Sequence, residues 1–96
     1  MEKIIEIKAL KNYKLFLKYS DGVEGVIDLS DIVGKGVFEA FKNYSFFENV
    51  KIGESDAPTW ENETDIDPLN QYLKLTGKTV EQYLADKKNR NVAYWL

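Results

Sequence analysis

Apolar and polar side chains alternate along residues 3–29, and this alternation constrains the fold more than any other feature. A strand places successive side chains on opposite faces, so a period of two predicts strands with one buried face. The predicted inward residues are Tyr13, Leu15, Leu17 and Tyr19, followed by Val23, Ile27 and Leu29. Between them, Asp21-Gly22 predicts a two-residue hairpin turn with positive φ at both positions. With KIIEIKAL as another strand, turning at Lys11 and Asn12, the pattern predicts a three-stranded antiparallel meander.

Short helices and a second hairpin are predicted to follow the meander. We expect a helical turn at residues 30–33 and, after the GKG break, a short helix with Val37, Phe38 and Phe41 inward. Ser45 and Glu48 fit a capping box, which predicts a helical turn at SFFE. NVKIG and PTWEN flank ESDA as a hairpin, and its predicted inward residues are Val50, Ile52 and Trp60.

Two helices are predicted at the C-terminal end. The first runs from Pro68 to about Thr76, with Asp67 as N-cap and Gly77 as its stop. The second opens at Thr79, which forms a capping box with Gln82, and its apolar stripe is Val80, Tyr83 and Leu84. The ending RNVAYWL is expected to pair with a sheet edge or to dock its aromatic side chains. The expected fold is α+β: a domain at residues 1–76 with an antiparallel sheet and short helices, and a helix and hydrophobic tail at 77–96 packed on it.

The residue types that are missing exclude several kinds of chemistry. The 96 residues include no cysteine and no histidine, which removes thiolate and histidine nucleophile systems and histidine-ligated zinc. We therefore expect no enzyme, and we assign no catalytic residue, cofactor or metal ligand. The start MEKIIEIKAL mixes charges into its apolar run, unlike a signal peptide, and no apolar stretch approaches the roughly 20 residues that span a bilayer. A cytoplasmic location is expected.

Charge is distributed unevenly along the chain, although its net value is only -3. Residues 54–67 hold six acids and no base, whereas residues 74–90 hold five bases and two acids. A compact fold could bring these two windows together; otherwise the first is an exposed acidic patch. With a pI near 4.9 and no basic stripe, direct nucleic-acid binding has little electrostatic support.

The densest acidic stretch, WENETDIDP, has three readings. Its alternate carboxylates are Glu61, Glu63, Asp65 and Asp67, and on one strand face they could hold a hard cation or act as a general acid and base. A calcium loop beginning at Glu61 fails, because Ile66 and Tyr72 occupy its glycine and glutamate positions. The structural reading has Glu61 and Glu63 facing water on an edge strand, Asp65 anchoring a turn and Asp67 capping the next helix.

Several segments together resemble a known family. YKLFLKYSDGVEGVIDLSDIV, VFEAFKNYSFFENVKI and PTWENETDIDP resemble, in order and spacing, the bacterial family catalogued as domain of unknown function 2442. The matching residues are Tyr19, Asp21, Gly22, Asp28, Leu29, Phe38, Phe41, Phe47, Val50, Trp60, Asn62, Asp65, Ile66 and Pro68. Phenylalanine is more usual at Tyr19 and leucine at Phe41. The resemblance covers about residues 3–75, and the last twenty residues lie outside the family pattern.

The resemblance implies a domain type more firmly than an activity. Relatives are often encoded beside another small uncharacterised protein in an arrangement similar to a toxin-antitoxin pair, so it implies a protein partner and supplies no catalytic residues. The expected function is a non-enzymatic protein-binding module, the antitoxin-like half of such a pair. Its candidate partner contacts are Glu61, Glu63, Asp65 and Trp95. The alternatives are a carboxylate-based divalent-metal protein or enzyme, and a homodimer formed through the C-terminal aromatics. No membrane partner is expected.

Overall fold

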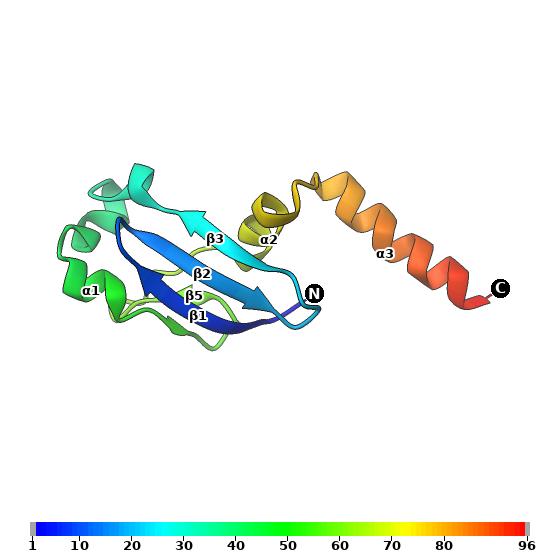
Figure 1. Ribbon diagram of the computed structural model, residues 1–96, viewed down its shortest axis with the longest axis horizontal. Coiled ribbons are helices and arrows are strands. Elements are labelled where there is room, and N and C mark those ends of the chain that lie inside the picture. Colours follow the sequence, from blue (N-terminus) through cyan, green and yellow to red (C-terminus); the bar gives the residue numbers. More distant parts are fainter. Residues whose placement is uncertain (1, 96) are drawn as a thin grey trace.

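A computed structural model of the chain describes residues 2–95, with side chains described for residues 2–88. The elements, in order, are β1 (Ile4–Leu10), β2 (Lys14–Tyr19), β3 (Glu24–Asp28), the 3-10 helices η1 (Ser30–Ile32) and η2 (Gly36–Lys42), α1 (Tyr44–Glu48), β4 (Lys51–Ile52), β5 (Pro58–Thr59), α2 (Pro68–Thr76) and α3 (Val80–Trp95). The predicted α+β class, the antiparallel meander β1-β2-β3 and the second hairpin β4-β5 are confirmed (Figure 1).

The core lies on one face of the three-stranded sheet. Leu17 of β2 pairs with Ile7 of β1 on one side and with Gly25 of β3 on the other. The alternation in β2 therefore acts as predicted, because Leu15, Leu17 and Tyr19 are fully buried. The core cluster is completed by residues from β1, β3, the helices and the loops between elements: Ile4, Ile27, Leu29, Phe41, Phe47, Trp60, Ile66, Tyr72 and Tyr83.

The β2-β3 turn differs from the prediction. Tyr19 and Val23 close the hairpin, with the Tyr19 N–H donating to the Val23 carbonyl at 2.8 Å, so the loop holds three residues rather than two. Only Gly22 has positive φ, at 93°. The Gly22 N–H donates to the Tyr19 carbonyl, and the Asp21 carboxylate accepts from the Val23 N–H. This is the three-residue loop in which a type I turn precedes a left-handed residue, and the Asp21 side chain stabilises it.

Four apolar residues predicted to face inward are exposed. Val37 is 67% exposed, because η2 is a 3-10 helix and aligns residues three apart, Phe38 and Phe41, toward the core. Ile52 lies in a two-residue strand at the rim of the molecule and is 39% exposed. Val80 and Leu84 are exposed because α3 contributes one buried side chain within residues 80–88, that of Tyr83.

Two of the three predicted helix starts are confirmed. The Asp67 carboxylate accepts from the Leu69 N–H at 3.0 Å at the start of α2, and Gly77 ends α2 with φ of 72°. Thr79 and Gln82 form the reciprocal capping box of α3. The box predicted at Ser45 and Glu48 is wrong: Asn43 caps α1 by accepting from the Ser45 N–H, so Ser45 already lies inside the helix.

α3 projects from the end of the body that holds the N-terminus and the β2-β3 turn (Figure 1). The molecule is consequently elongated, at 53 × 22 × 20 Å. Residues 90–95, expected as a separate tail, continue α3 instead of pairing with a sheet edge. The side chain of Trp95 and all of Leu96 lie outside the described part of the chain. No helix within residues 2–95 is long and apolar enough to cross a membrane.

Candidate functional site on the second hairpin

The acidic stretch is built on two consecutive turns, and the first joins β4 to β5. The Gly53 N–H donates to the Ala57 carbonyl at 2.9 Å, which encloses the loop residues Glu54, Ser55 and Asp56. Asp56 has φ of 59°, in the left-handed region. The turn therefore projects two carboxylates from the end of a short hairpin.

The second turn follows β5 directly and carries the residues of WENETDIDP. The Trp60 N–H donates to the Thr64 carbonyl at 2.9 Å, and the Asn62 side chain accepts from the Thr64 N–H at 3.1 Å. Glu61 and Glu63 thus lie in a turn rather than on an edge strand, and Glu63 has φ of 65°. Asp65 then pairs with Thr59 through an isolated bridge. The alternating strand that would align four carboxylates on one face does not form.

Trp60 anchors both turns to the core, as predicted. Its side chain is 1% exposed, and its Nε1–H donates to the Phe47 carbonyl at 2.8 Å. Its ring centroid lies 4.5 Å from that of Phe41 and 5.9 Å from that of Phe47. The position of the acidic turns is thereby set by a buried aromatic cluster.

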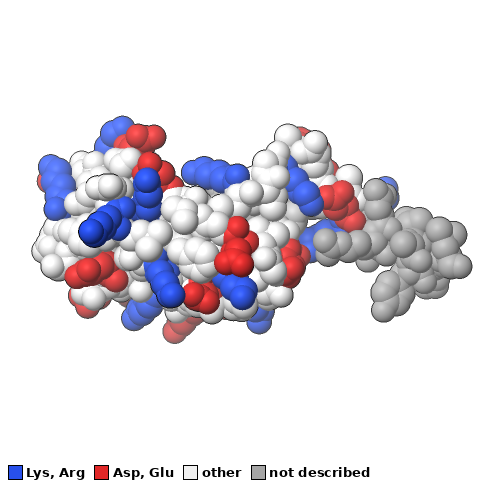
Figure 2. All heavy atoms as spheres, viewed as in Figure 1, with Lys and Arg blue, Asp and Glu red and all other residues white. Residues whose placement is uncertain are grey.

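Between the turns lies an open groove of about 640 Å³. Its apolar floor is the exposed Ile52 beside the buried Trp60. Its charged lining residues are Glu54, Glu61, Glu63 and Asp65, together with one base, Lys51. Five of the six acids in residues 54–67 are exposed, Asp56 being partly buried. Within the described part of the chain, none of these six acids belongs to an ion pair. Elsewhere, Figure 2 shows lysines and carboxylates interspersed over the face in view.

The groove does not gather metal ligands. Within the described residues no three acidic side chains lie close enough to hold a metal ion. Asn62 is committed to its own turn and Asp67 caps α2. What the groove offers is a mainly acidic rim, interrupted by Lys51, around a small apolar floor at Ile52. Sequence reasoning missed Ile52 as an exposed floor residue, because its alternation with Val50 indicated burial.

The other residues of the family pattern have local structural roles. The Asp28 carboxylate accepts from the Ser30 N–H at 2.9 Å at the start of η1, and hydrogen bonds from Ser30 lower the pKa of Asp28. Pro68 is the first residue of α2, and its carbonyl accepts from the Tyr19 hydroxyl at 2.7 Å. Asp21 accepts a hydrogen bond from the Tyr72 hydroxyl at 2.6 Å, which no sequence signal indicated.

Comparison with known proteins places the chain in a family without assigning an activity. No curated protein and no solved structure matches it. A family pattern does match, over residues 4–70, which include the meander, both acidic turns and the start of α2. The chain therefore belongs to the family described as a protein of unknown function, DUF2442.

Proposed function

We propose that this chain is a non-enzymatic protein-binding module, the antitoxin-like half of a two-protein pair, and that it binds a small basic protein through the groove of the second hairpin. The observation that carries the proposal is the set Glu54, Glu61, Glu63 and Asp65, which are exposed and make no ion pair within the described residues. The pairing itself rests on the resemblance, which implies a protein partner encoded nearby.

Electrostatics supports a basic partner. Residues 54–67 carry six negative charges and no positive one, and such a field raises the rate of association with a positively charged surface. Exposed carboxylates keep their hydration until a partner displaces it, so their contribution should fall steeply as salt rises.

The shape of the groove supports a protein rather than a small ligand. Drug-sized ligands favour concave sites that bury most of their surface, whereas this groove is open to solvent. Ile52, which is 39% exposed, provides a small apolar floor within a polar rim, which is the usual anatomy of a protein interface. A lysine or arginine could lay its aliphatic stem on this floor while its charge meets Glu61 or Glu63.

The test is a pull-down with a tagged chain from the native host, at low and at physiological salt, with mass spectrometry of the eluate. The hairpin variant carries Glu54→Gln, Glu61→Gln, Glu63→Gln and Asp65→Asn. The control variant removes the same charge at exposed acids outside the groove, by Glu24→Gln, Asp31→Asn, Glu48→Gln and Glu81→Gln.

We expect one stoichiometric basic protein to elute with the parent chain and with the control variant. It should be depleted at least about tenfold with the hairpin variant, because several charge contacts are lost together. If both variants retained the partner equally, the binding site would lie outside the groove of the second hairpin. An eluate without a partner would leave the proposal unsupported.

Two further measurements separate the alternatives from this proposal. Saturable amide shifts confined to residues 60–68 during titration with magnesium, calcium or manganese would favour a divalent-metal site. A dimeric mass by light scattering would favour the homodimer formed through the C-terminal aromatics, to which Trp95 belongs.

A further inference from the structure

The base of α3 is attached to the body by very few side chains. Within residues 80–88 only Tyr83 is buried, and its ring packs edge-on against Tyr72 of α2, with centroids 5.6 Å apart. The ion pair between Lys78 and Asp86, at 2.6 Å, joins the linker between α2 and α3 to α3 itself. Neither of these contacts involves the sheet.

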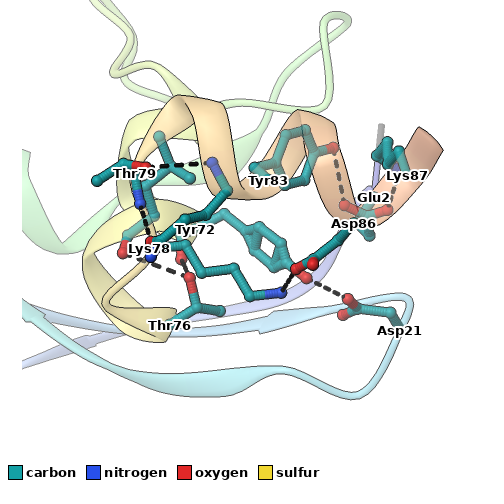
Figure 3. A network of polar contacts seen from close by, with 11 residues as sticks. Glu2, Asp21, Tyr72, Thr76, Lys78, Thr79, Tyr83, Asp86 and Lys87 are labelled. Carbon is teal, nitrogen blue, oxygen red and sulfur yellow. Dashed lines mark hydrogen bonds and ion pairs between the residues drawn. The ribbon is translucent and has the colours of Figure 1, made fainter. Parts of the chain in front are cut away.

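One carboxylate supplies the polar contact with the rest of the body. Glu2, just before β1, accepts from the Tyr83 hydroxyl through Oε1 at 2.9 Å and from the Lys87 ammonium through Oε2 at 2.7 Å. Lys87 also lies 5.0 Å from the centroid of the Tyr83 ring. Figure 3 shows the Glu2 carboxylate facing both side chains, which are one helical turn apart. Both oxygens of Glu2 are thus used by α3.

The backbone next to Glu2, at Lys3, is held by the β2-β3 turn. The Lys3 N–H donates to the Ser20 hydroxyl at 3.1 Å, and the Ser20 N–H donates to the Lys3 carbonyl at 2.7 Å. The next residue of that turn, Asp21, accepts from the Tyr72 hydroxyl at 2.6 Å (Figure 3). The turn therefore positions the partners of both tyrosines, Glu2 for Tyr83 and Asp21 for Tyr72.

We infer that Glu2 is a latch that fixes the direction of α3, and that α3 is a displaceable arm which swings on the 77–79 linker when this carboxylate is neutralised or occupied by another cation. A single buried aromatic ring leaves the helix free to rotate about its contact, whereas two charge-assisted hydrogen bonds to one rigidly held carboxylate define an orientation. The inference does not depend on the groove of the second hairpin, and it stands or falls separately from the proposed function.

The decisive experiment measures the distance between α3 and the far end of the body. Because the chain has no cysteine, Lys88→Cys and Glu48→Cys give two defined sites for spin labels, on α3 and on α1. Pulsed dipolar spectroscopy of this labelled parent should give a narrow distance distribution. Glu2→Gln should broaden it, because the amide keeps the size of the side chain and loses its charge. Glu81→Gln, at an exposed acid on α3, should leave it narrow.

Amide exchange provides a second readout that separates release of the arm from loss of the fold. In Glu2→Gln we expect amides of residues 83–88 to exchange at least about tenfold faster, as expected for the loss of hydrogen bonds to a charged group, while amides of β2 keep their protection. Tyr83→Phe, which keeps the ring and the ion pair between Lys87 and Glu2, should give a smaller increase. An unchanged distance distribution in Glu2→Gln overturns the inference, and so does an equal increase in exchange across α3 and β2.

Discussion

At the scale of single residues, Glu63 adopts a backbone conformation that is uncommon for a residue other than glycine. Its φ of 65° lies in the left-handed region, which costs an L residue roughly 1–2 kcal/mol and glycine almost nothing. We expect Glu63→Gly to raise the free energy of unfolding by about 0.5–1 kcal/mol, after the greater flexibility of glycine in the unfolded chain is subtracted. Urea denaturation at neutral pH measures this change.

Glu61 provides the matched control, because it lies in the same turn without positive φ. Glu61→Gly should lower the free energy of unfolding by about 0.5–1 kcal/mol through the cost of ordering glycine. Equal losses in the two variants would mean that the Glu63 conformation stores no strain.

Individual residues also show which predictions from the sequence are correct, which are wrong, and why. Asp67 and Thr79 were identified as caps because a capping bond joins positions two or three apart, so all the information is local. Ile52 and Leu84 were misplaced because their exposure depends on which other segments pack over them, which alternation or helical spacing alone does not report. Trp60 was placed correctly because a large aromatic ring in so small a domain is rarely left outside the core.

At the scale of elements, three hairpin loops share one shape. Each closes with an N–H to carbonyl bond across three residues, at Tyr19 and Val23, at Gly53 and Ala57, and at Trp60 and Thr64. The last loop residue has positive φ in each case, and it is Gly22, Asp56 and Glu63 respectively. Only the first of these residues is a glycine, the residue type that most readily indicates positive φ in a sequence. The acidic stretch was therefore read as a strand because its turn is made by a residue type that seldom marks one.

The start of α3 gives a prediction at the same scale. The Thr79 hydroxyl accepts from the Gln82 N–H at 3.1 Å, and the Thr79 N–H donates to the Gln82 side chain at 2.8 Å. Thr79→Ala removes the first bond and should cost about 1 kcal/mol. Because Tyr83 is the one buried residue of α3 within residues 80–88, we expect faster amide exchange in the first turn of α3 and unchanged exchange in β2.

Thr79→Ser keeps the hydroxyl and should restore most of the protection of that turn. If the alanine variant exchanged as slowly as the serine variant, the cap would not stabilise α3.

At the scale of the whole molecule, the acidic and basic windows of the sequence are not joined by an ion pair in the part whose side chains are described. No ion pair within the described residues joins 54–67 to 74–88, and Lys78 and Lys87 are engaged by Asp86 and Glu2 instead. The sequence shows that charge is distributed unevenly along the chain, but only the fold decides whether the opposite charges neutralise each other. A basic partner would neutralise the charge of the acids in residues 54–67, which no ion pair within the described residues offsets.

The dependence of stability on pH reports on the hydrogen-bonded carboxylates and tyrosines that connect the helices to the sheet. Burial raises the pKa of Glu2, but hydrogen bonds from Lys87 and Tyr83 outweigh it, so the net pKa lies below the ordinary 4.5. A lowered pKa contributes stability that is present above pH 4.5 and is lost as pH falls through the folded value. Burial, with the charge of nearby carboxylates, raises the pKa values of Tyr19 and Tyr72 well above the ordinary 10.0. Their contribution is present below pH 10.0 and is lost as pH rises through the folded values.

We therefore expect the urea midpoint to be flat between roughly pH 5 and pH 9, since the chain has no histidine to titrate there. It should fall on both sides of that range. Tyr72→Phe removes the hydrogen bond to Asp21 and should lower the midpoint at neutral pH. The same variant should lose less of its remaining stability than the parent above about pH 10, because one of the tyrosines that must stay protonated is gone. Parallel alkaline curves for the two proteins would show that Tyr72 ionises as freely in the folded state as in the unfolded one.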